Sequence, residues 1–315
     1  MINEPSSENR PTHPVEQPPE PAPVTGEYDP VLPADGRKLH PLERRAQEMR
    51  ARQREGIAQP EAMARPRRGR RVSQRIPLSD APLTYALVAI NILIFAVGLF
   101  ASQLGDQFFE FGAKYTPFIV LKGEYYRLFS AMFLHADPAH IFFNSYALYV
   151  IGAPLETRFG RSRFGIIYLL GGLMGSVLSL VLGELLVPSI GASGAVFALL
   201  GAEMVFLYRN RQAFGGQGRA RLNQLFFLLA INLFIGIAST RIDNWGHIGG
   251  FIGGAALAWF IGPLYQPAPH PERPGVMIAE DTNPLARNFG AVLAYGVALV
   301  AILILSIPAL ERSLT

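Results

Sequence analysis

Residues 245–254 read WGHIGGFIGG, a histidine followed by two overlapping Gly-x-x-x-Gly pairs in an otherwise apolar stretch. Glycines at this spacing let two helix backbones approach closely within lipid, so the stretch predicts a tightly packed transmembrane helix. A histidine in such a helix is costly to bury in hydrocarbon and therefore marks a candidate functional residue. Outward from these ten residues, the chain consists largely of further apolar segments.

Seven segments approach the length of roughly 20 residues that a helix needs to cross a bilayer. They are 83–101, 139–155, 164–187, 190–208, 222–238, 245–264 and 289–309. The composition agrees, because 50% of the residues are apolar and 17% are charged, against roughly 25% charged in a typical soluble domain. Cysteine is absent from the sequence, which excludes disulfides, Cys-ligated metals and thiol nucleophiles. We predict an all-α, polytopic helical membrane protein.

The first 76 residues differ from the rest, since they are rich in proline and have no sustained apolar face. Their composition, acidic first and then basic, predicts a disordered tail, although helix formers allow a short helix at 41–54. The arginine-rich stretch 65–71 could bind nucleic acid. We favour instead a role in holding this end on the cytoplasmic side and contacting anionic membrane lipid, and we expect no nucleic-acid partner.

Arginines gather in alternate connections between the segments, which fixes the expected orientation. They are Arg158, Arg161 and Arg163 after the second segment, Arg209, Arg211, Arg219 and Arg221 after the fourth, and Arg273 and Arg287 after the sixth. With a cytoplasmic amino terminus, seven spans place the carboxyl terminus outside. We divide the chain into a tail (1–76), a six-span core (77–265), a cytoplasmic linker (266–288) and a seventh helix with a short external tail (289–315).

The first connection, 102–138, is long and rich in phenylalanine and tyrosine. Aromatic side chains favour the interfacial zone, so we expect this segment to pack on or into the outer leaflet, with Arg127 pinning it. The alternative is a small exposed loop with scattered aromatics. At its end, Asp137-Pro138 is typical of a helix cap followed by proline at the first helical position.

The next polar residues fall near the outer ends of three segments. His140 and Asn144 are four residues apart and share one helix face, and Ser193 lies between Gly191 and Gly194. A rise of 1.5 Å per residue from the inner ends places Ser193 and His247 at nearly the same depth, in the outer half of the bilayer. A serine and an imidazole at equal depth form a plausible nucleophile and base, with His140, Asn144 and the Ser193 N–H as candidate donors to an oxyanion.

These motifs resemble those of the rhomboid intramembrane serine proteases. The matching residues are His135, His140 and Asn144 (His-x4-His-x3-Asn), 191–194 (Gly-x-Ser-Gly), 246–254 (Gly-His with the glycine pairs), 152–158 (GAPLETR) and 125–127 (Tyr-Tyr-Arg). The resemblance covers about 81–265. It implies a six-span core, to which one carboxyl-terminal span is added here.

The resemblance also implies the roles of the site residues. Ser193 is then the nucleophile and His247 the general base and acid, without an aspartate, while His140, Asn144 and the Ser193 amide bind the oxyanion. Supporting positions are expected at His135, Gly191, Gly194, Phe197, Arg127 and Glu156. Phe197 departs from the family, which often has tyrosine there; the aromatic face against His247 remains but the hydroxyl is lost.

Other interpretations of the same residues were weighed. A metal on His135, His140 and His247 is disfavoured, since no His-Glu-x-x-His motif exists and Asp137 and Asp243 read as a cap and a loop residue; no cofactor is expected. His247 could be a packing histidine, and Asn144 a tie between helices. We expect Glu156 to hold the inner end of the second segment beside Arg158.

The sequence therefore predicts an intramembrane endopeptidase that acts on membrane proteins, in a bacterial plasma membrane. The alternative is a non-catalytic membrane chaperone or adaptor with the same fold, which loss of the serine or histidine would signal; neither is lost. A transporter would show paired charges at the midplane. Glu203 has no evident cationic partner in a span, and we expect it to form an interhelical bond.

Overall fold

The computed structural model describes Leu42 and residues 45–51, 80–239, 242–272 and 275–315. The chain separates into two compact units, Met1–Arg70 and Arg71–Thr315. In the first unit, residues 45–51 are helical, within the range where a short helix was allowed. The remainder of the predicted disordered tail and the arginine-rich stretch 65–71 lie outside the described residues. All further description concerns the second unit.

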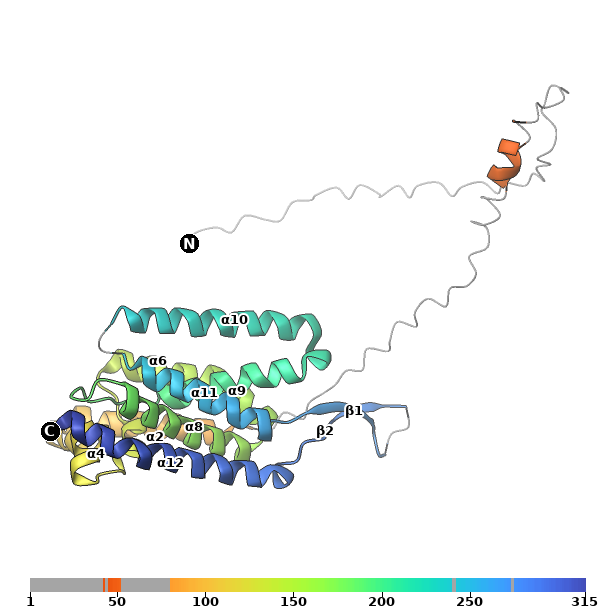
Figure 1. The fold of residues 1–315 in the computed structure, drawn as a ribbon. Helices are drawn as coiled ribbons and strands as arrows, with labels where there is room; N and C mark the ends of the chain where they lie inside the picture. Colours follow the sequence, from red (N-terminus) through yellow and green to blue (C-terminus); the bar gives the residue numbers. More distant parts are fainter. Residues whose placement is uncertain (1–41, 43–44, 52–79, 240–241, 273–274) are drawn as a thin grey trace, which may run out of the picture. The chain divides into compact units, whose positions relative to one another are not determined.

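Helices dominate the second unit (Figure 1). They are α2 (Pro82–Phe100), α3 (Ser102–Gly112), α4 (Thr116–Lys122), α5 (Arg127–Ser130), the 3-10 turn η1 (Ala131–Phe133), α6 (Pro138–Ala147), the π-helical η2 (Leu148–Gly152), α7 (Ala153–Phe159), α8 (Arg161–Leu182), α9 (Ser193–Arg209), α10 (Arg211–Ile237), α11 (Asn244–Ile261), the 3-10 turn η3 (Leu285–Asn288) and α12 (Phe289–Leu314). Each of the seven predicted apolar segments is helical, the second as the continuous run α6, η2 and α7.

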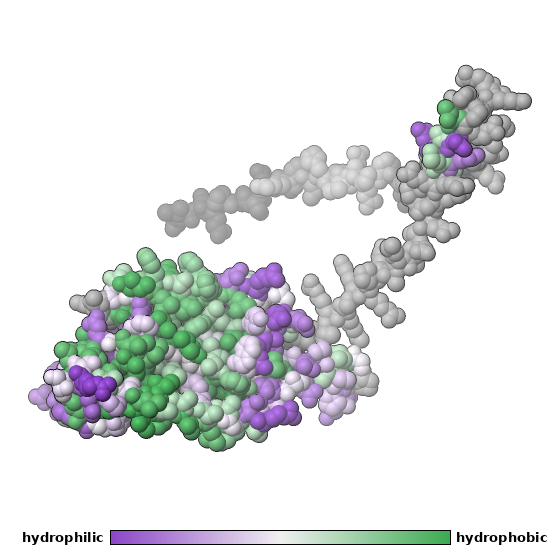
Figure 2. All heavy atoms as spheres, viewed as in Figure 1, coloured by the Kyte–Doolittle hydropathy of each residue, from purple (hydrophilic) through white to green (hydrophobic). Residues whose placement is uncertain are grey.

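Within the described residues, four helical segments are long and apolar enough to cross a membrane: α2, α8, α10 and Leu285–Leu314. Figure 2 shows apolar side chains covering the middle of the visible face, with polar side chains gathered toward its two ends. This distribution is that of a multi-pass membrane protein, whose apolar surface faces lipid and whose helix ends face water. The count of six spans plus one remains a prediction.

The segment predicted to be a cytoplasmic linker, 266–288, forms most of a two-stranded hairpin. Strands β1 (Tyr265–Pro269) and β2 (Met277–Asp281) pair antiparallel, with Tyr265 opposite Asp281 and Pro269 opposite Met277. The mostly helical fold agrees with the all-α prediction, but the linker predicted at 266–288 contains a short hairpin that the sequence analysis did not anticipate. Two prolines in β1 hide the strand from sequence analysis, because proline is tolerated only at sheet edges.

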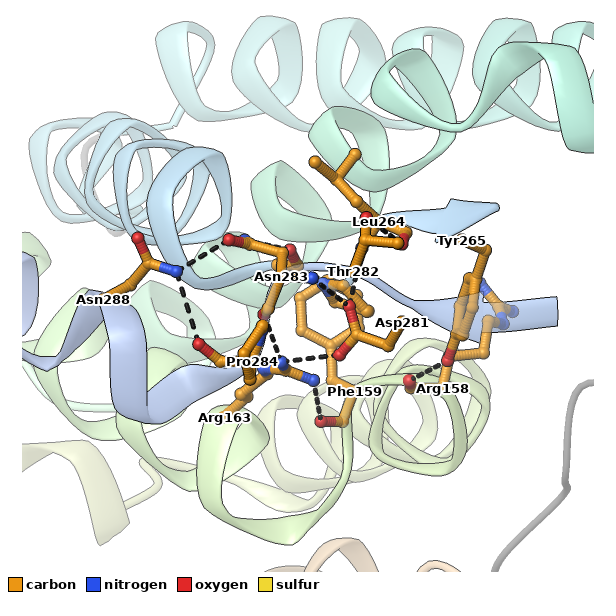
Figure 3. Close-up of polar contacts among 12 residues, drawn as sticks. Arg158, Phe159, Arg163, Leu264, Tyr265, Asp281, Thr282, Asn283, Pro284 and Asn288 are labelled. Atoms are coloured by element: carbon orange, nitrogen blue, oxygen red, sulfur yellow. Dashed lines mark hydrogen bonds and ion pairs between the residues drawn. The ribbon is translucent and has the colours of Figure 1, made fainter. Parts of the chain in front are cut away.

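The hairpin is fastened to the helices by polar contacts between residues distant in sequence (Figure 3). Arg163 of α8 pairs with the Asp281 carboxylate at 2.7 Å and donates to the Asn283 carbonyl oxygen at 2.6 Å. Asp281 also accepts from the backbone N–H of Leu264 at 3.0 Å. The Tyr265 hydroxyl donates to the Arg158 carbonyl oxygen at 2.7 Å. The hairpin thereby joins the end of α11 to the first turns of α8 and to the approach to α12.

Two buried glutamates hold other helix ends. Glu156 accepts from the N–H of Leu83 at 3.0 Å and from the N–H and hydroxyl of Thr84, both at 2.7 Å. It therefore caps the first turn of α2, a structural role as expected, although its partners lie on another helix rather than beside it at Arg158. Backbone N–H groups at a helix start have no carbonyl partner within the helix, which explains the cap.

Glu203 of α9 is fully buried and has two cationic partners. Arg221 of α10 donates to it at 3.1 Å, and Arg158 of α7 lies 3.5 Å away. The expected interhelical bond is thus present. Both arginines lie outside the predicted spans, 139–155 and 222–238, so neither was evident as a partner within a span.

The centre of the unit is a trio of helices, α8, α9 and α11, packed through glycine. A side chain at Gly250 would overlap the carbonyl of Gly194 on α9, and one at Gly254 would overlap the carbonyl of Ala198. The other glycine pair faces α8, because a Cβ at Gly249 would lie 2.8 Å from the Met174 carbonyl oxygen. The close helix contact predicted from the Gly-x-x-x-Gly pairs is confirmed.

Candidate active site

Ser193 is the first residue of α9, so its backbone N–H has no carbonyl acceptor within the helix. The residue two positions earlier, Gly191, has φ +124°, a conformation that only glycine adopts without strain. Its N–H donates to the Ala131 carbonyl oxygen at 2.9 Å, which ties the loop before Ser193 to the first connection. The loop therefore presents both a hydroxyl and a free N–H at a helix start.

His247 lies in the first turn of α11, whose N-cap is Asp243; the Asp243 carboxylate accepts from the Gly246 N–H at 2.8 Å. The imidazole is 8% exposed and stacks on Phe197, with ring centroids 4.1 Å apart and an interplanar angle of 6°. The predicted aromatic face against His247 is thus confirmed. Among the described residues, His247 Nδ1 has no hydrogen-bond partner.

Three glycines bring the serine and the histidine together. A Cβ at Gly175 of α8 would lie 2.6 Å from the Gly246 carbonyl oxygen and 3.4 Å from the Gly194 Cα. A Cβ at Gly194 would itself lie 3.4 Å from that same Gly246 oxygen. The residue after Ser193 and the residue before His247 are therefore in near contact across α9 and α11, which only residues without side chains permit.

His140 approaches the same point from α6. Its N–H is capped by Asp137 at 2.9 Å, as the Asp-Pro pattern predicts. His140 Nδ1 accepts from the Ala136 N–H at 3.3 Å, so a neutral imidazole carries its proton on Nε2. A Cβ at Gly191 would lie 2.6 Å from that Nε2 and 3.8 Å from Ser193 Oγ. His140 therefore directs an N–H donor toward the serine.

Asn144 and His135 complete the histidine side of the site. Asn144 is buried and donates one N–H to the His140 carbonyl oxygen at 3.0 Å, a bond within its own helix rather than between helices. The His135 ring packs edge-on against His140, with centroids 5.1 Å apart. Burial, assisted by the neighbouring His140, lowers the pKa of His135 to about 4, so this imidazole is neutral at pH 7.

Within the described residues, no group of three His, Cys, Asp or Glu side chains is arranged to hold an ion. His135 and His140 instead form a ring contact, and His247 stacks on a phenyl ring. These environments suit neutral imidazoles packed beside a serine.

Sequence analysis missed a polar network beside Ser193, which we call the Asp243 network: Lys114, Ser179, Ser189 and Asp243. Lys114 Nζ donates to Ser179 Oγ at 2.8 Å, and both Ser179 and Ser189 donate to Asp243, the latter at 2.6 Å. Lys114, Ser189 and Asp243 line a cavity of about 30 Å³ that also reaches Ser193, which is room enough for a water molecule. The only sequence signal was the position of Asp243 one helical turn before His247.

Arg127 anchors the first connection as predicted. It is 2% exposed, pairs with Glu124 at 2.6 Å, and donates to the carbonyl oxygens of Glu110 and Ala113 at 2.6 and 3.1 Å. Several aromatic side chains of this connection are exposed, among them Phe109, Phe111, Tyr125, Tyr126 and Phe129. An anchored backbone with exposed aromatics suits a segment at the membrane interface.

Comparison with known proteins gives a consistent match. A family model described as the rhomboid domain matches residues 122–264. Rhomboid protease GluP of Bacillus subtilis (strain 168) is 39% identical over 181 residues, covering 57% of this chain and 34% of that protein. RHOMBOID-like protein 1 of Arabidopsis thaliana is 34% identical over 214 residues, covering 58% of this chain and 54% of its own length. The chain thus spans about a third to about half of these relatives.

Proposed function

Because the chain belongs to the rhomboid family, we propose that it is an intramembrane endopeptidase that cleaves transmembrane proteins near the outer membrane face. Ser193 is the nucleophile and His247 the general base and acid. The observation that supports this proposal is the glycine junction, where Gly194 and Gly246 lie in near contact. Beside it, His247 stacks on Phe197, which lies one helical turn after Ser193. This near contact of the two helix starts supports pairing the Ser193 hydroxyl with the His247 imidazole in one site.

The reaction follows from this arrangement. His247 accepts the Ser193 hydroxyl proton while the oxygen attacks the carbonyl carbon of the scissile peptide. The tetrahedral intermediate collapses, His247 returns the proton to the leaving amine, and an acyl-enzyme remains. Water, for which the cavity beside Ser193 has room, then attacks the ester with His247 again as base.

The negative oxygen of the intermediate needs donors already in place. The Ser193 N–H, unpaired within α9, is one, and His140 Nε2–H is a second because Nδ1 of that ring is occupied as an acceptor. Asn144 uses one amide N–H within its own helix and has a second to offer. We assign the oxyanion to these three groups.

Substrates are other membrane proteins, because a site among transmembrane helices is reached most directly by a segment already in the bilayer. The scissile stretch must lose its helical hydrogen bonds to expose a carbonyl, so residues that weaken a helix are expected there. We place the amino terminus in the cytoplasm and the carboxyl terminus outside, with six core spans and a seventh, and take a bacterial plasma membrane as the host membrane.

The test is cleavage of a model single-span substrate by purified protein in detergent, with labelling of the enzyme by a fluorophosphonate probe. Wild type should cleave the substrate and take up the probe at Ser193. Ser193→Ala should do neither while it retains the melting temperature of wild type. A wild-type protein that binds the substrate but neither cuts it nor reacts with the probe would support a chaperone or adaptor instead.

A further inference from the structure

Three segments donate hydrogen bonds to the carboxylate of Asp243. The Gly246 N–H belongs to the first turn of α11, which carries His247, and it donates at 2.8 Å. Ser189 belongs to the loop that leads into Ser193, and it donates at 2.6 Å. Ser179 comes from the last turn of α8. One side chain therefore touches both the helix of the proposed base and the loop of the proposed nucleophile.

Lys114 joins the first connection to the same point. Its ammonium donates to Ser179 at 2.8 Å, and its backbone exchanges two hydrogen bonds with Ser189, at 3.0 and 2.9 Å. The residue is 2% exposed. Burying a lysine costs free energy unless an opposite charge lies nearby. The opposite charge here is Asp243, and Ser179 forms hydrogen bonds with both residues.

The charge of Asp243 is well supported. Burial alone would raise the pKa of Asp243, but the hydrogen bonds from Ser179 and Ser189, the Lys114 charge and the Gly246 N–H together hold it below its ordinary value. Burial lowers the pKa of Lys114, and Asp243 opposes that effect. At neutral pH the network therefore holds a carboxylate beside the proposed active site.

That carboxylate also faces the imidazole. Asp243 and His247 are four residues apart, so they lie on one face of the helix start. The ionisable groups whose charges act on His247 are Asp243 from its own element and His140 from α6; Lys114 of the first connection acts on Asp243. Phe197 of α9, which stacks on His247, is uncharged, and so is Ser179 of α8, which bonds to Asp243. His247 Nδ1 has no partner among the described residues, so Asp243 does not act as the third member of a triad.

We propose that Asp243 is a positioning residue for the reaction, which with Lys114, Ser179 and Ser189 fixes the Ser193 loop against the first turn of α11 and holds a negative charge one turn from His247. The inference rests on the proposed function and deepens it. A helix cap alone requires only the bond to Gly246, and an exposed aspartate or serine would supply it. The buried lysine and the second serine lie outside α11, and a helix cap does not need them. Both are explained because the network holds separate segments in fixed relative positions, which we call the registration of these segments.

The decisive experiment compares two variants that break the same charge pair. Asp243→Asn keeps a good helix cap and removes the negative charge, whereas Lys114→Met keeps the stem and removes the positive one. The exposed pair Asp106→Asn and Lys122→Met serves as control. For each protein, kcat and KM for the model substrate and the fluorophosphonate labelling rate are measured between pH 3 and 9.

The electrostatic role predicts opposite shifts. The base must be neutral to accept a proton, so the rate falls on the acidic side. Loss of the nearby carboxylate makes protonation of the imidazole harder, and Asp243→Asn should move the acidic limb about one unit to lower pH. Lys114→Met should move it to higher pH. The kcat of Asp243→Asn should fall about tenfold with KM within about twofold. Shifts in the same direction, or none, would overturn the electrostatic role.

The registration is tested without reference to activity. Hydrogen exchange is measured on Asp243→Ala and on the control Asp106→Ala, in the peptides that cover 186–196 and 243–250. We expect Asp243→Ala to speed exchange in both peptides about tenfold, and Asp106→Ala to change neither. Unchanged exchange in 186–196 would refute the link to the Ser193 loop. A wild-type protein that neither cleaves nor labels would refute the proposed function alone, since the exchange measurement still decides the registration.

Discussion

The trio α8, α9 and α11 and the outlying helices α10 and α12 are both apolar, yet they are built differently. In the apolar stretch of α8, 44% of the residues are buried, against 11% in α10 and 11% in Leu285–Leu314. In Figure 1, α10 and α12 form opposite edges of the helical unit. The trio buries glycines against backbone, whereas α10 and α12 expose large side chains such as Phe227 and Leu305.

This difference shows which helices must be positioned accurately. Lipid tails are as apolar as leucine, so an outlying helix needs only length and hydropathy and gains little from a particular partner. Helices of the trio instead approach at backbone distance, and a single methyl group there meets a carbonyl oxygen. The residues proposed for catalysis are held by the trio and by α6 against it, where small displacements are least tolerated.

The largest expected effect is chemical. Ser193→Ala and His247→Ala should each abolish cleavage, because neither helix surface offers a second nucleophile or base at the junction. Residues that act as a unit are not additive, so the double variant should be no slower than either single one. Cleavage is measured with the model substrate, and melting temperature confirms the fold. Substantial turnover by Ser193→Ala would remove the serine from the mechanism.

The next effect tests the packing difference directly with one substitution in two places. Gly250→Ala forces a methyl group into the Gly194 carbonyl, so we expect a loss of about 1–3 kcal/mol in stability and a rate at least about tenfold lower. Gly296→Ala in α12 meets nothing within 4 Å and should be neutral or slightly stabilising. Thermal unfolding in detergent and initial rates are the measurements. Equal effects at the two positions would contradict the claim that the trio depends on close backbone packing and that α12 does not.

The donors on α6 should matter less than the nucleophile. His140→Ala and Asn144→Ala should each lower kcat about 10²–10³-fold, the usual cost of one oxyanion donor. The melting temperature should change little for His140→Ala, because its ring contacts lie at the site. The rate per folded molecule distinguishes an oxyanion donor from a residue that only holds helices together. If a variant loses stability but keeps its rate, the residue has only the structural role.

A pH-dependent effect is expected at His135. Its pKa in the folded protein is about 4, below the ordinary 6.5. Between these two pH values, the imidazole is protonated in the unfolded chain and neutral in the folded protein. The resulting loss of stability begins as pH falls below 6.5 and grows until about pH 4, reaching about 3 kcal/mol. His135→Gln should flatten this part of the curve of melting temperature against pH. An unchanged curve in His135→Gln would show that the imidazole is accessible to protons.

The smallest effects belong to the outlying helices. Phe227→Ala in α10 and Leu305→Ala in α12 remove side chains that are 68% and 79% exposed. Both variants should keep activity within about twofold and stability within about 0.5 kcal/mol, as surface substitutions usually do. Kinetics and melting temperature are measured as before. A clear rise in KM for Phe227→Ala would instead identify that face of α10 as a contact for substrate.

The sequence by itself was sufficient to predict helices at the seven apolar segments and to nominate the residues of the proposed site. Apolar length marks these segments because a helix that crosses a bilayer needs it, and Gly-x-x-x-Gly spacing marks α11 because close helix contact demands small residues. The short helices α3, α4 and α5 of the first connection were not predicted. Capping chemistry placed the start of α6 correctly at Asp137-Pro138. Ser193, His247 and His140 were identifiable because polar groups in an apolar segment are rare and costly.

The tertiary structure alone decided how separate segments pair. Lys114 and Ser179 are 65 residues apart, Ser189 and Asp243 are 54 apart, and Arg163 and Asp281 are 118 apart. Glu203 has its two arginine partners on two other helices, α7 and α10. Periodicity and propensity are local properties of a chain, whereas a buried charge is matched by whatever group the packing of helices brings near it. The type of each residue therefore determined its chemistry. The packing of the helices, whose distances the glycines set, determined which partner each residue has.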